Sequence, residues 1–353
     1  MANFLKDYSG KKILVTGHTG FKGAWLSRIL VLAGADVYGL ALEAETNSLF
    51  DVAGDLGLKE SSILDIRDRI AVENYFTTHR FDGIFHLAAQ PLVRRSYKEP
   101  IETFDTNVMG TAHILNAAVI NKATHWVVAI TTDKVYRNVE KLGGYFEDEP
   151  LGGKDPYSAS KAATEMVVSA WQTIASHSEE KISIASARAG NVIGGGDTAE
   201  DRLIPDLIRG FHAGEKTIIR NPESIRPWQH VLDPLNGYLT MGSALIAGRT
   251  ISPAFNFGPG EESKLTVMQM ADYACTQWAG SKGLDIQIDP GAVHESGLLW
   301  LSSALATKEL GWSNRFEAYE AIRWTIDWEK EAMHSSPLAA LDRQIFEFYG
   351  AQR

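Results

Sequence analysis

Apolar runs alternate with segments of helical periodicity through the first half of the chain. The run ILVTG at 13–17 precedes a glycine-rich turn, an amphipathic segment that continues to about Leu32, and a second apolar run, DVYGLAL, at 36–42. Continuous apolar runs are typical of parallel strands, because helices cover both faces of such a sheet. The pattern therefore predicts a strand–helix–strand unit at the start of the chain.

The same alternation continues to about residue 190. Three more apolar strands and two long helices follow, the strands within 81–93, 125–130 and 182–190 and the helices at about 100–120 and 156–176. Such alternation is typical of an α/β fold with a doubly wound parallel sheet. Neither an internal repeat nor a low-complexity linker interrupts the remainder. We therefore predict two domains, 1–190 and 191–353, the second smaller and of mixed α/β structure.

Three glycines occupy the turn of the first strand–helix–strand unit. Gly17, Gly20 and Gly23 follow one another at a three-residue spacing. The first glycine permits a tight turn, the second lets a pyrophosphate approach the backbone, and the third allows close packing of helix on strand. In this frame the triplet predicts a dinucleotide-binding loop, with a merely structural turn as the alternative.

A tyrosine and a lysine four residues apart lie at the start of the second long helix. Asp155 precedes this helix as a predicted cap, and Pro156 stands in its first turn. Tyr157 and Lys161 therefore share one helical face. There the ammonium group would stabilise a phenolate, which could exchange a proton with a substrate hydroxyl near neutral pH. This spacing alone usually marks a surface pair, but behind a dinucleotide fold it favours a catalytic pair.

The segment TTDKVY follows the apolar run HWVVAI and places Thr132, Asp133 and Lys134 in succession. An aspartate beside a lysine is most often a solvated pair. At the carboxyl end of a parallel strand, however, side chains face the ligand crevice. The position therefore favours a chemical role for these three residues.

Two further segments carry side chains whose role the pattern leaves open. Asn107 falls within the predicted helix at about 100–120, where a buried amide is unusual unless it hydrogen-bonds a neighbouring strand or an active-site loop. Trp228 and His230 alternate in RPWQHV, which predicts a strand. A core position is the expected alternative for Trp228.

Composition and charge narrow the class of protein. The 353 residues are 44% hydrophobic, and the formal net charge is −10, so neither charge nor any basic run indicates a nucleic-acid partner. The single cysteine, Cys275, excludes an intrachain disulfide and a cysteine-rich zinc site, and we predict no metal. With no apolar run long enough for a bilayer and no charged-then-apolar leader, we expect a cytoplasmic protein without a membrane partner.

The spacings G-x-x-G-x-x-G and Y-x-x-x-K resemble the extended short-chain dehydrogenase/reductase superfamily, in its branch acting on nucleotide sugars. The segments GHTGFKG, LAAQPLVRRSY, ARAGNVIGGGDTAEDRLIPDLIRG and IIRNPESIRPWQHVLDPLNGY closely resemble the CDP-glucose 4,6-dehydratases. This resemblance extends from about residue 8 to about residue 330. It implies a Rossmann-type fold whose chain crosses between its domains more than once. It also implies tightly held NAD and conversion of CDP-glucose to CDP-4-keto-6-deoxyglucose, an entry step to dideoxyhexoses of bacterial surface polysaccharide.

The resemblance assigns the NAD contacts to the glycine-rich turn and to the ends of later strands. These positions are Gly17, Thr19, Gly20, Phe21, Lys22, Gly23, Asp65, Ile66, Leu87, Ala88 and Ala89, with Tyr157 and Lys161 at the nicotinamide ribose. Ala41 stands where the superfamily often has an acid that holds the adenosine ribose. Glu43 is the nearest acid and is our candidate. Without a basic residue there, NAD is favoured over NADP.

The resemblance also assigns catalytic roles. Thr132, Tyr157 and Lys161 match the superfamily's catalytic set. Asp133 and Lys134 stand where the dTDP-glucose 4,6-dehydratases have an Asp-Glu pair that removes the C5 proton and protonates the departing C6 hydroxyl. Which group takes the C5 proton here stays open.

Substrate ligands are expected in the second half of the chain and near the fourth strand. The predicted set is Gln90, Asn191, Arg202, Leu203, Arg220, Arg226 and His230, and the later segment with His294 and Glu295 resembles a sugar-nucleotide segment of the family. Structural salt bridges are the alternative for each arginine. Thr198 stands where the family has a tryptophan, which bears on base affinity or identity.

Two other functions stay open. One is another nucleotide-sugar enzyme, such as an inverting UDP-sugar dehydratase, a dTDP-sugar enzyme or an epimerase. The other is a sensor that holds NAD without turnover, although such a protein has no need of Thr132, Tyr157 and Lys161. The two long helices resemble those that form a four-helix dimer interface in this superfamily, which implies a homodimer or a dimer of dimers.

Overall fold

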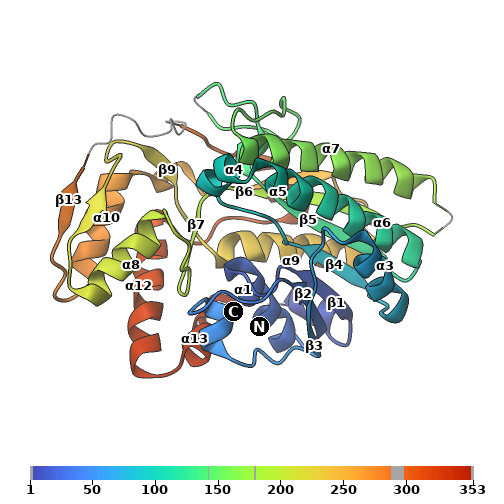
Figure 1. The fold of residues 1–353 in the computed structure, drawn as a ribbon, viewed down its shortest axis with the longest axis horizontal. Coiled ribbons are helices and arrows are strands. Elements are labelled where there is room, and N and C mark those ends of the chain that lie inside the picture. Colours follow the sequence, from blue (N-terminus) through green and yellow to red (C-terminus); the bar gives the residue numbers. More distant parts are fainter. Residues whose placement is uncertain (1–2, 142, 179, 288–297, 351–353) are drawn as a thin grey trace.

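The structure, a computed structural model, describes residues 3–350 except 142, 179 and 288–297. Its centre is a seven-stranded parallel sheet (Figure 1). From edge to edge the strands are β11 (Ala254–Phe257), β6 (Ser183–Ala189), β5 (Trp126–Thr132), β4 (Gly83–His86), β1 (Lys12–Thr16), β2 (Asp36–Ala41) and β3 (Glu60–Ile63). The doubly wound parallel sheet predicted from the sequence is confirmed.

The strand order reverses at β1. From β1 the chain runs through β2 to β3 on one side, then returns to β4 and continues through β5 and β6 on the other. In sheets of this kind, ligands bind in the crevice outside the carboxyl ends of the strands at such a switch point. The glycine-rich turn follows β1 and Leu87 follows β4, so both predicted cofactor segments lie at this crevice.

Helices cover both faces of the sheet (Figure 1). On one face lie α3 (Arg69–Thr78), α6 (Thr111–Asn121) and α7 (Pro156–Ser176), and on the other lie α1 (Phe21–Leu32) and α9 (Leu232–Ile246). Successive residues of β1 serve the two faces: Leu14 joins one apolar cluster, and Ile13 and Val15 join the other. This alternation explains why strands buried on both faces are continuously apolar.

The predicted helix at about 100–120 is three elements in succession. α5 (Pro100–Phe104) continues through a π-helical turn, η2 (Asp105–Gly110), into α6. Two shorter helices, α2 (Leu49–Ala53) and α4 (Val93–Lys98), follow β2 and β4. A single helical turn, η3 (Asp133–Val135), follows β5.

A smaller mixed α/β region lies beside the sheet, at the left of Figure 1. Its helices are α8 (Leu203–Ala213), α10 (Val267–Gln277) and α12 (Ala318–His334). Its strands pair as β10 (Gln229–His230) with β7 (Val192–Ile193), β12 (Lys264–Thr266) with β9 (Ile225–Pro227), and β13 (Leu284–Ile286) with β8 (Thr217–Ile219). Two other helices pack on the domain of the large sheet: α11 (Ala304–Leu310) contacts β11 and α9, and α13 (Pro337–Gly350) contacts α1, α2 and α12.

The chain passes between the two regions more than once. After β9 and β10 it returns through α9 and β11 to the large sheet. A division at residue 190 would therefore separate β11 from the sheet that it completes. The segment RPWQHV was predicted as one strand, but it forms parts of β9 and β10 in separate sheets, with Trp228 between them.

The described residues contain neither a membrane-spanning helix nor a cluster of metal ligands. Within 3–350, with the gaps given above, no helix combines the length and apolar character that a membrane crossing requires. Those residues also contain no group of three or more His, Cys, Asp or Glu side chains placed to hold a metal ion. His294 and Glu295 lie outside the described residues.

Candidate active site

The glycine-rich turn packs directly against the end of β4. Gly17 has a φ of 74°, and a Cβ atom on it would lie 2.8 Å from the backbone N of Ala88. A Cβ atom on Gly23 would lie 2.0 Å from the carbonyl O of Gly17. Neither position accepts a side chain without a shift of the backbone, so the turn, the strand end and the start of α1 form one close cradle. This cradle fits the pyrophosphate of a dinucleotide.

Further predicted cofactor residues lie after β4 and in the first turn of α1. Leu87, Ala88 and Ala89 follow β4 and are only half-buried, as a backbone surface for a cofactor requires. Lys22, in the first turn of α1, has its pKa lowered to about 8, first by burial and then by the charge of Arg202. The charges that act on Lys22 therefore include those of the predicted substrate ligand Arg202 and of the predicted catalytic residues Asp133 and Lys161.

The predicted adenosine side is more open. The hydroxyl of Thr19 donates to the carbonyl O of Leu42 at 3.0 Å and ties the turn to the end of β2. Glu43 follows and is exposed. Asp65 forms an ion pair with Arg67 at 2.6 Å, while Ile66 is buried. The contacts of Glu43, Asp65 and Ile66 with adenosine stay predictions.

Sequence reasoning gave no role to His18, the second residue of the turn. Its Nε2 lies 2.7 Å from Oγ of Ser61 on β3, and its ring packs against Gly39 of β2 and edge-on to Phe50. Burial lowers the pKa of His18 to about 4, so the ring is neutral near pH 7. The histidine therefore braces the turn against β2 and β3. The sequence contained one indication of this role: the glycine spacing does not require a histidine in GHTG, yet His18 occupies that position.

The start of α7 fixes the predicted catalytic tyrosine. Asp155 caps the helix by accepting a hydrogen bond from Ser158 N at 2.9 Å, as predicted. The backbone N of Tyr157 donates to Oγ of Ser96 on α4 at 3.1 Å. Both Tyr157 and Lys161 are buried, so this pair is not the surface pair that was the alternative.

Burial shifts the pKa values of the pair in opposite directions. It raises the pKa of Tyr157 to about 12, and a hydrogen bond from Thr132 opposes that rise. It lowers the pKa of Lys161 to about 8, and the charge of Glu165 opposes that fall. Lys161 Nζ donates to the carbonyl O of Ile130 at 3.2 Å, at the end of the neighbouring β5.

The end of β5 brings the remaining predicted catalytic residues to the same place. The hydroxyl of Thr132 donates to Oδ1 of Asp133 at 2.8 Å. Asp133 begins η3, and its side chain is 3% exposed. Lys134 Nζ lies 3.9 Å from Asp133 Oδ1, and its side chain is 35% exposed. A buried acid with an accessible base beside it provides two groups for proton exchange with a substrate.

Asn107 anchors the loop after β4 from the π-helical turn η2. Its Oδ1 accepts a hydrogen bond from Gln90 N at 2.8 Å, and its Nδ2 donates to Gln90 O at 3.1 Å and to Ser160 Oγ at 2.9 Å. Of the two roles that the sequence left open for this amide, its hydrogen bonds are with a loop and not with a neighbouring strand. The side chain of Gln90 is itself buried and donates to Thr103 Oγ1 at 2.9 Å. Its geometry favours a structural role over the predicted substrate contact.

A buried ion pair lies behind the catalytic residues. Arg188 Nη2 of β6 lies 2.8 Å from Glu165 Oε2 of α7, and the two side chains are 5% and 4% exposed. Glu165 also accepts hydrogen bonds from Thr131, the residue before Thr132, and from Ser186 Oγ at 2.9 Å. The pair therefore joins β5, β6 and α7 at the point where the catalytic groups begin.

The same network extends to the loop after β5. Arg188 Nη1 donates to the hydroxyl of Tyr136 at 2.7 Å, and that hydroxyl donates to Oδ1 of Asn256 on β11 at 2.7 Å. Asn256 Nδ2 donates to the carbonyl O of Tyr145 at 2.8 Å. Sequence reasoning missed this network because its members are far apart along the chain and their pairing depends on strand order.

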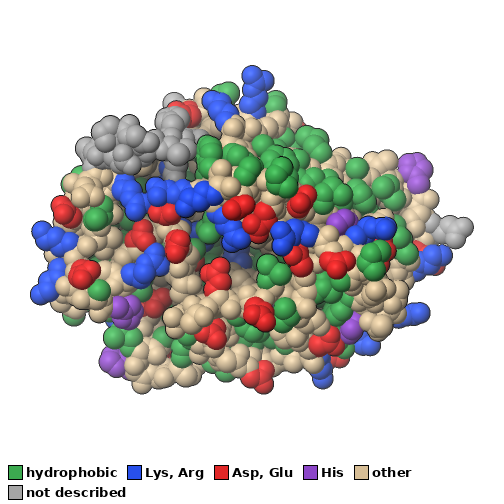
Figure 2. All heavy atoms as spheres, viewed as in Figure 1, with side chains coloured by type: hydrophobic (Ala, Val, Ile, Leu, Met, Phe, Trp, Pro, Cys, Tyr) green, Lys and Arg blue, Asp and Glu red, His purple; other side chains and the backbone are tan. Residues whose placement is uncertain are grey.

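Most of the predicted substrate residues belong to the smaller region of the chain. Arg202 Nη1 lies 3.1 Å from Asp197 Oδ2, and Arg220 Nη1 lies 2.9 Å from Asp201 Oδ1. The charge of Arg202 acts to lower the pKa of Tyr157, against the larger effect of burial, which raises it. The predicted residues Asn191, Leu203 and Arg226 are half-buried in the same region. Figure 2 shows a hollow in this face, with Lys or Arg side chains in it and charges of both signs along its rim.

His230 has a different environment from the one expected of a substrate ligand. It is fully buried, with ring contacts to Trp25, Phe316 and Trp324. Burial lowers the pKa of its imidazole to about 3, so the ring is neutral near pH 7. This aromatic surrounding favours a core role, because the histidine exposes no surface to a substrate.

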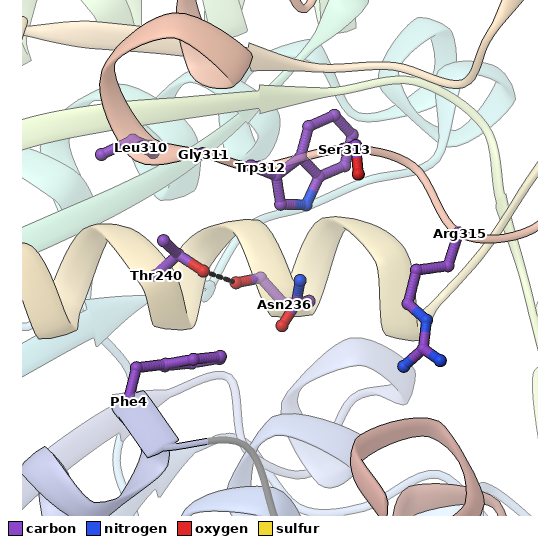
Figure 3. Close-up of a pocket in the computed structure, with 8 residues that line it drawn as sticks. All are labelled: Phe4, Asn236, Thr240, Leu310, Gly311, Trp312, Ser313 and Arg315. Carbon is purple, nitrogen blue, oxygen red and sulfur yellow. Dashed lines mark hydrogen bonds between the residues drawn. The ribbon is translucent and has the colours of Figure 1, made fainter. Parts of the chain in front are cut away.

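Two cavities among the described residues are lined by neither the glycine-rich turn nor the end of β5. One of about 310 Å³ lies beside Asp197, Thr198, Trp328 and Glu329, at the place where the family resemblance led us to expect a tryptophan. The other, of about 200 Å³, is shown in Figure 3 between the N-terminal segment, α9 and the chain at 310–315. It is lined by Phe4, Asn236, Thr240, Leu310, Gly311, Trp312, Ser313 and Arg315, which include none of the predicted site residues.

Comparison with known proteins shows the family of the chain and similar proteins. The model of the NAD dependent epimerase/dehydratase family matches residues 13–256. The chain is 44% identical to the CDP-glucose 4,6-dehydratase of Salmonella typhimurium over 98% of each chain, and 28% identical to the dTDP-glucose 4,6-dehydratase of Shigella flexneri over 90% of this chain and 92% of that one. Among solved structures, the dTDP-glucose 4,6-dehydratase of Bacillus anthracis in complex with NAD is similar in fold, with a TM-score of 0.76 and 21% identity over 92% of this chain and 98% of that one.

The lowered pKa of Lys161 predicts how catalysis depends on pH. Because burial lowers that pKa to about 8, the ammonium form that would stabilise the Tyr157 phenolate is lost above this pH. We expect kcat/KM to fall as the pH rises through about 8. Lys161→Arg, which keeps its charge, should lack this decline whatever activity it retains. A wild-type profile that stays flat to about pH 9.5 would contradict the assignment.

The buried Glu165–Arg188 pair predicts a large stability effect. Glu165→Gln leaves the guanidinium of Arg188 buried without its counter-charge, and should lower the free energy of unfolding by about 3–5 kcal/mol. Glu73→Gln is the matched control, because it breaks the exposed pair of Glu73 with Arg69 and should cost about 0.5 kcal/mol or less. Urea unfolding of both variants measures the difference. Equal losses would mean that burial adds nothing to this pair.

Proposed function

The chain belongs to the NAD dependent epimerase/dehydratase family, and on this basis we propose that it removes water from CDP-glucose to give CDP-4-keto-6-deoxyglucose, with NAD as cofactor. The observation that carries the proposal is the pairing of Asp133 and Lys134 at the end of β5, opposite Tyr157 on α7. Hydride transfer at C4 needs only the threonine, tyrosine and lysine set. An acid–base pair beside that set supplies what elimination of water requires in addition.

The residues around the glycine-rich turn fit NAD. The turn offers a backbone cradle without side chains at Gly17 and Gly23, and 87–89 present accessible backbone after β4. No basic residue stands at Ala41 or Glu43 to favour an additional phosphate on the adenosine ribose. When bound, NAD would accept a hydride from C4 of the sugar and return one to C6, so that the reaction has no net redox change.

Proton transfer from the 4-hydroxyl is the proposed role of Tyr157. Its pKa of about 12 in the buried site is too high for spontaneous ionisation near pH 7, so the phenolate needs electrostatic support. Lys161, one helical turn away, supplies a positive charge, and the hydroxyl of Thr132 lies close enough to hydrogen-bond the tyrosine. Thr132 would also hold the sugar oxygen in line for this transfer.

Elimination of water is the proposed role of Asp133 and Lys134. Once C4 is a ketone, the proton at C5 is acidic and the C6 hydroxyl can leave. Asp133 is buried and already receives a hydrogen bond from Thr132, whereas Lys134 is more exposed and lies 3.9 Å from it. One of these groups takes the proton at C5 while the other protonates the leaving hydroxyl, and variants of each residue assign the two roles.

CDP-glucose is the proposed substrate because of the similarity to the Salmonella typhimurium enzyme. The nearer alternative, another nucleotide-sugar enzyme, differs in its base or in the configuration at C5. The sensor alternative conflicts with a buried Tyr157 and Lys161 facing a strand end that carries an acid–base pair. On our proposal the enzyme acts in the cytoplasm, and its product would enter the synthesis of dideoxyhexoses of bacterial surface polysaccharide.

Mass spectrometry of the reaction products tests this function. We expect purified protein with NAD to remove one water from CDP-glucose and to leave UDP-glucose and dTDP-glucose unchanged. Asp133→Asn should slow this loss by about 10²- to 10⁴-fold, the range typical of a general acid or base. Loss of water from another sugar nucleotide would keep the reaction and change the substrate. If none of the three loses water, the dehydratase proposal is wrong.

We also propose that a second copy of the chain covers the outer surface of α5, α6 and α7. Exposed apolar side chains gather on these neighbouring helices, and Figure 2 shows a hydrophobic area over the region of α5 and α7. Ile101 is 75% exposed and Met166 is 57% exposed, which is unusual for apolar side chains on adjacent helices. A twofold contact would pack these helices against their equivalents as a four-helix interface.

Charge placed on this surface should separate the copies. We expect the double substitution Ile101→Glu and Met166→Glu to give a monomer in size-exclusion chromatography with light scattering, while wild type elutes as a dimer or a larger even-numbered assembly. Met333→Glu on α12 is the control, because Met333 is 55% exposed but lies on another face. A monomeric wild type, or a double variant that still dimerises, would rule this interface out.

A further inference from the structure

One carboxylate joins two arginines from opposite sides of the crevice. Asp201 Oδ1 lies 2.8 Å from Arg94 Nη1 and 2.9 Å from Arg220 Nη1. Arg94 belongs to α4, beside the parallel sheet, whereas Arg220 follows β8 in the smaller region. The three side chains are between 38% and 47% exposed, so the cluster lies at the surface. Sequence reasoning had assigned only Arg220 to the substrate.

The backbone of Asp201 supports a specific role for its carboxylate. Its φ of 59° lies in the left-handed region, which side chains other than glycine, asparagine and aspartate rarely adopt. Asp201 immediately precedes Arg202, the N-cap residue of α8. The turn therefore sends two neighbouring side chains to different partners: Asp201 to the two arginines and Arg202 to Asp197.

The cluster lies next to the catalytic groups, because Arg94 stands two residues before Ser96 on α4, and Ser96 Oγ accepts a hydrogen bond from the backbone N of Tyr157 at 3.1 Å. Arg202 is near enough for its charge to lower the pKa values of both Tyr157 and Lys22. The residue before Arg202 is therefore at the edge of the predicted active site. Figure 2 shows acidic and basic side chains together along the rim of the hollow in this face. A nucleotide sugar that reached Tyr157 would have to place its diphosphate close to this rim.

The ion pairs of this cluster are easy to exchange. Half-exposed pairs contribute little to stability, because water already solvates both partners. Here two guanidinium groups share a single carboxylate oxygen, so each keeps further N–H donors that this oxygen does not use. A diphosphate offers more oxygens and more negative charge than one carboxylate, and a guanidinium group can bind phosphate oxygens in a fork.

We propose that Arg94 is a diphosphate ligand of the nucleotide sugar, and that Asp201 holds Arg94 and Arg220 in the diphosphate's place until the substrate binds. The inference rests on the proposed function only in that the ligand is a nucleoside diphosphate sugar. Arg94 then binds the diphosphate from the side of the sheet, and Arg220 binds it from the smaller region. The substrate thereby replaces an internal bridge across the crevice with its own bridge.

Calorimetric titration of NAD-loaded protein with CDP tests the proposal without turnover. We expect Arg94→Gln to weaken CDP binding about tenfold, the effect of losing one charged hydrogen bond. Arg95→Gln is the matched control, because Arg95 is on the same helix with the same charge but pairs with Glu102 at 3.0 Å. It should bind CDP within about twofold of wild type.

CDP binding by Asp201→Asn shows whether the Asp201 carboxylate competes with the diphosphate for the two arginines or positions these arginines for it. If the carboxylate occupies the place of the diphosphate, the neutral amide should bind CDP more tightly than wild type, by about threefold or more. Weaker binding by this variant would mean that Asp201 positions the arginines for the ligand, which overturns the second part of the proposal. Binding of CDP by Arg94→Gln at the wild-type affinity overturns the first part.

Titrations with UDP and dTDP keep this test distinct from that of the proposed function. Arg94 would contact phosphate and not the base. Whichever of CDP, UDP and dTDP binds wild type best, Arg94→Gln should therefore weaken its binding by about tenfold. A substrate other than CDP-glucose in the mass-spectrometric assay would therefore leave this inference standing. Normal water loss from CDP-glucose, with unchanged diphosphate binding by Arg94→Gln, would reject the inference alone.

Discussion

The buried ion pair of Glu165 and Arg188 is the interaction on which the active site depends. A charged pair sheltered from water is stable only when most of its remaining donors and acceptors are also satisfied. Here Thr131, Ser186, Tyr136 and the carbonyl O of Glu147 bind the pair, and Arg188 Nε is left without a partner among the described residues. Those partners belong to β5, β6 and the loop after β5. The buried charge pair therefore holds Thr131 near the end of β5, directly before Thr132, the last residue of the strand, and Asp133.

Helix α7 carries charged side chains that serve both the stability of the fold and the predicted chemistry. Tyr157, Lys161 and Glu165 stand at successive four-residue intervals on α7, so all three face β5 and β6. Burial alone would make Lys161 a poor cation, but the carboxylate of Glu165 opposes that effect while it also neutralises Arg188. The helix thus links the stability of the sheet to the charge state of the catalytic pair, and a change in one affects the other.

Features that depend on local spacing were predictable from the sequence, and features that depend on distant contacts were not. The strand–helix–strand unit, the glycine-rich turn and the cap at Asp155 follow from neighbours within a few residues. The need of Asn107 for a hydrogen-bond partner, either a strand or a loop, followed from its polarity alone, and the choice of the loop did not. His230 was assigned by resemblance, and its aromatic neighbours come from Trp25, Phe316 and Trp324, far away along the chain. The bridge at Asp201 likewise joins segments whose proximity depends on the return of the chain across the crevice.

The π-helical turn η2 sets the phase of the helix that contains it. A π turn holds one residue more than an α turn, and one residue of an α-helix corresponds to a rotation of about 100°. Residues before 105 are therefore rotated by about 100° relative to the positions that an uninterrupted α-helix would give them with respect to residues after 110. The turn itself carries the buried Asn107, which contacts Gln90, and α5 before it carries the exposed Ile101. The number of residues in this one turn thus determines which side chains face the catalytic crevice and which face outward on the apolar surface. An insertion or deletion within 105–110 would misalign one of these surfaces whenever it preserved the other.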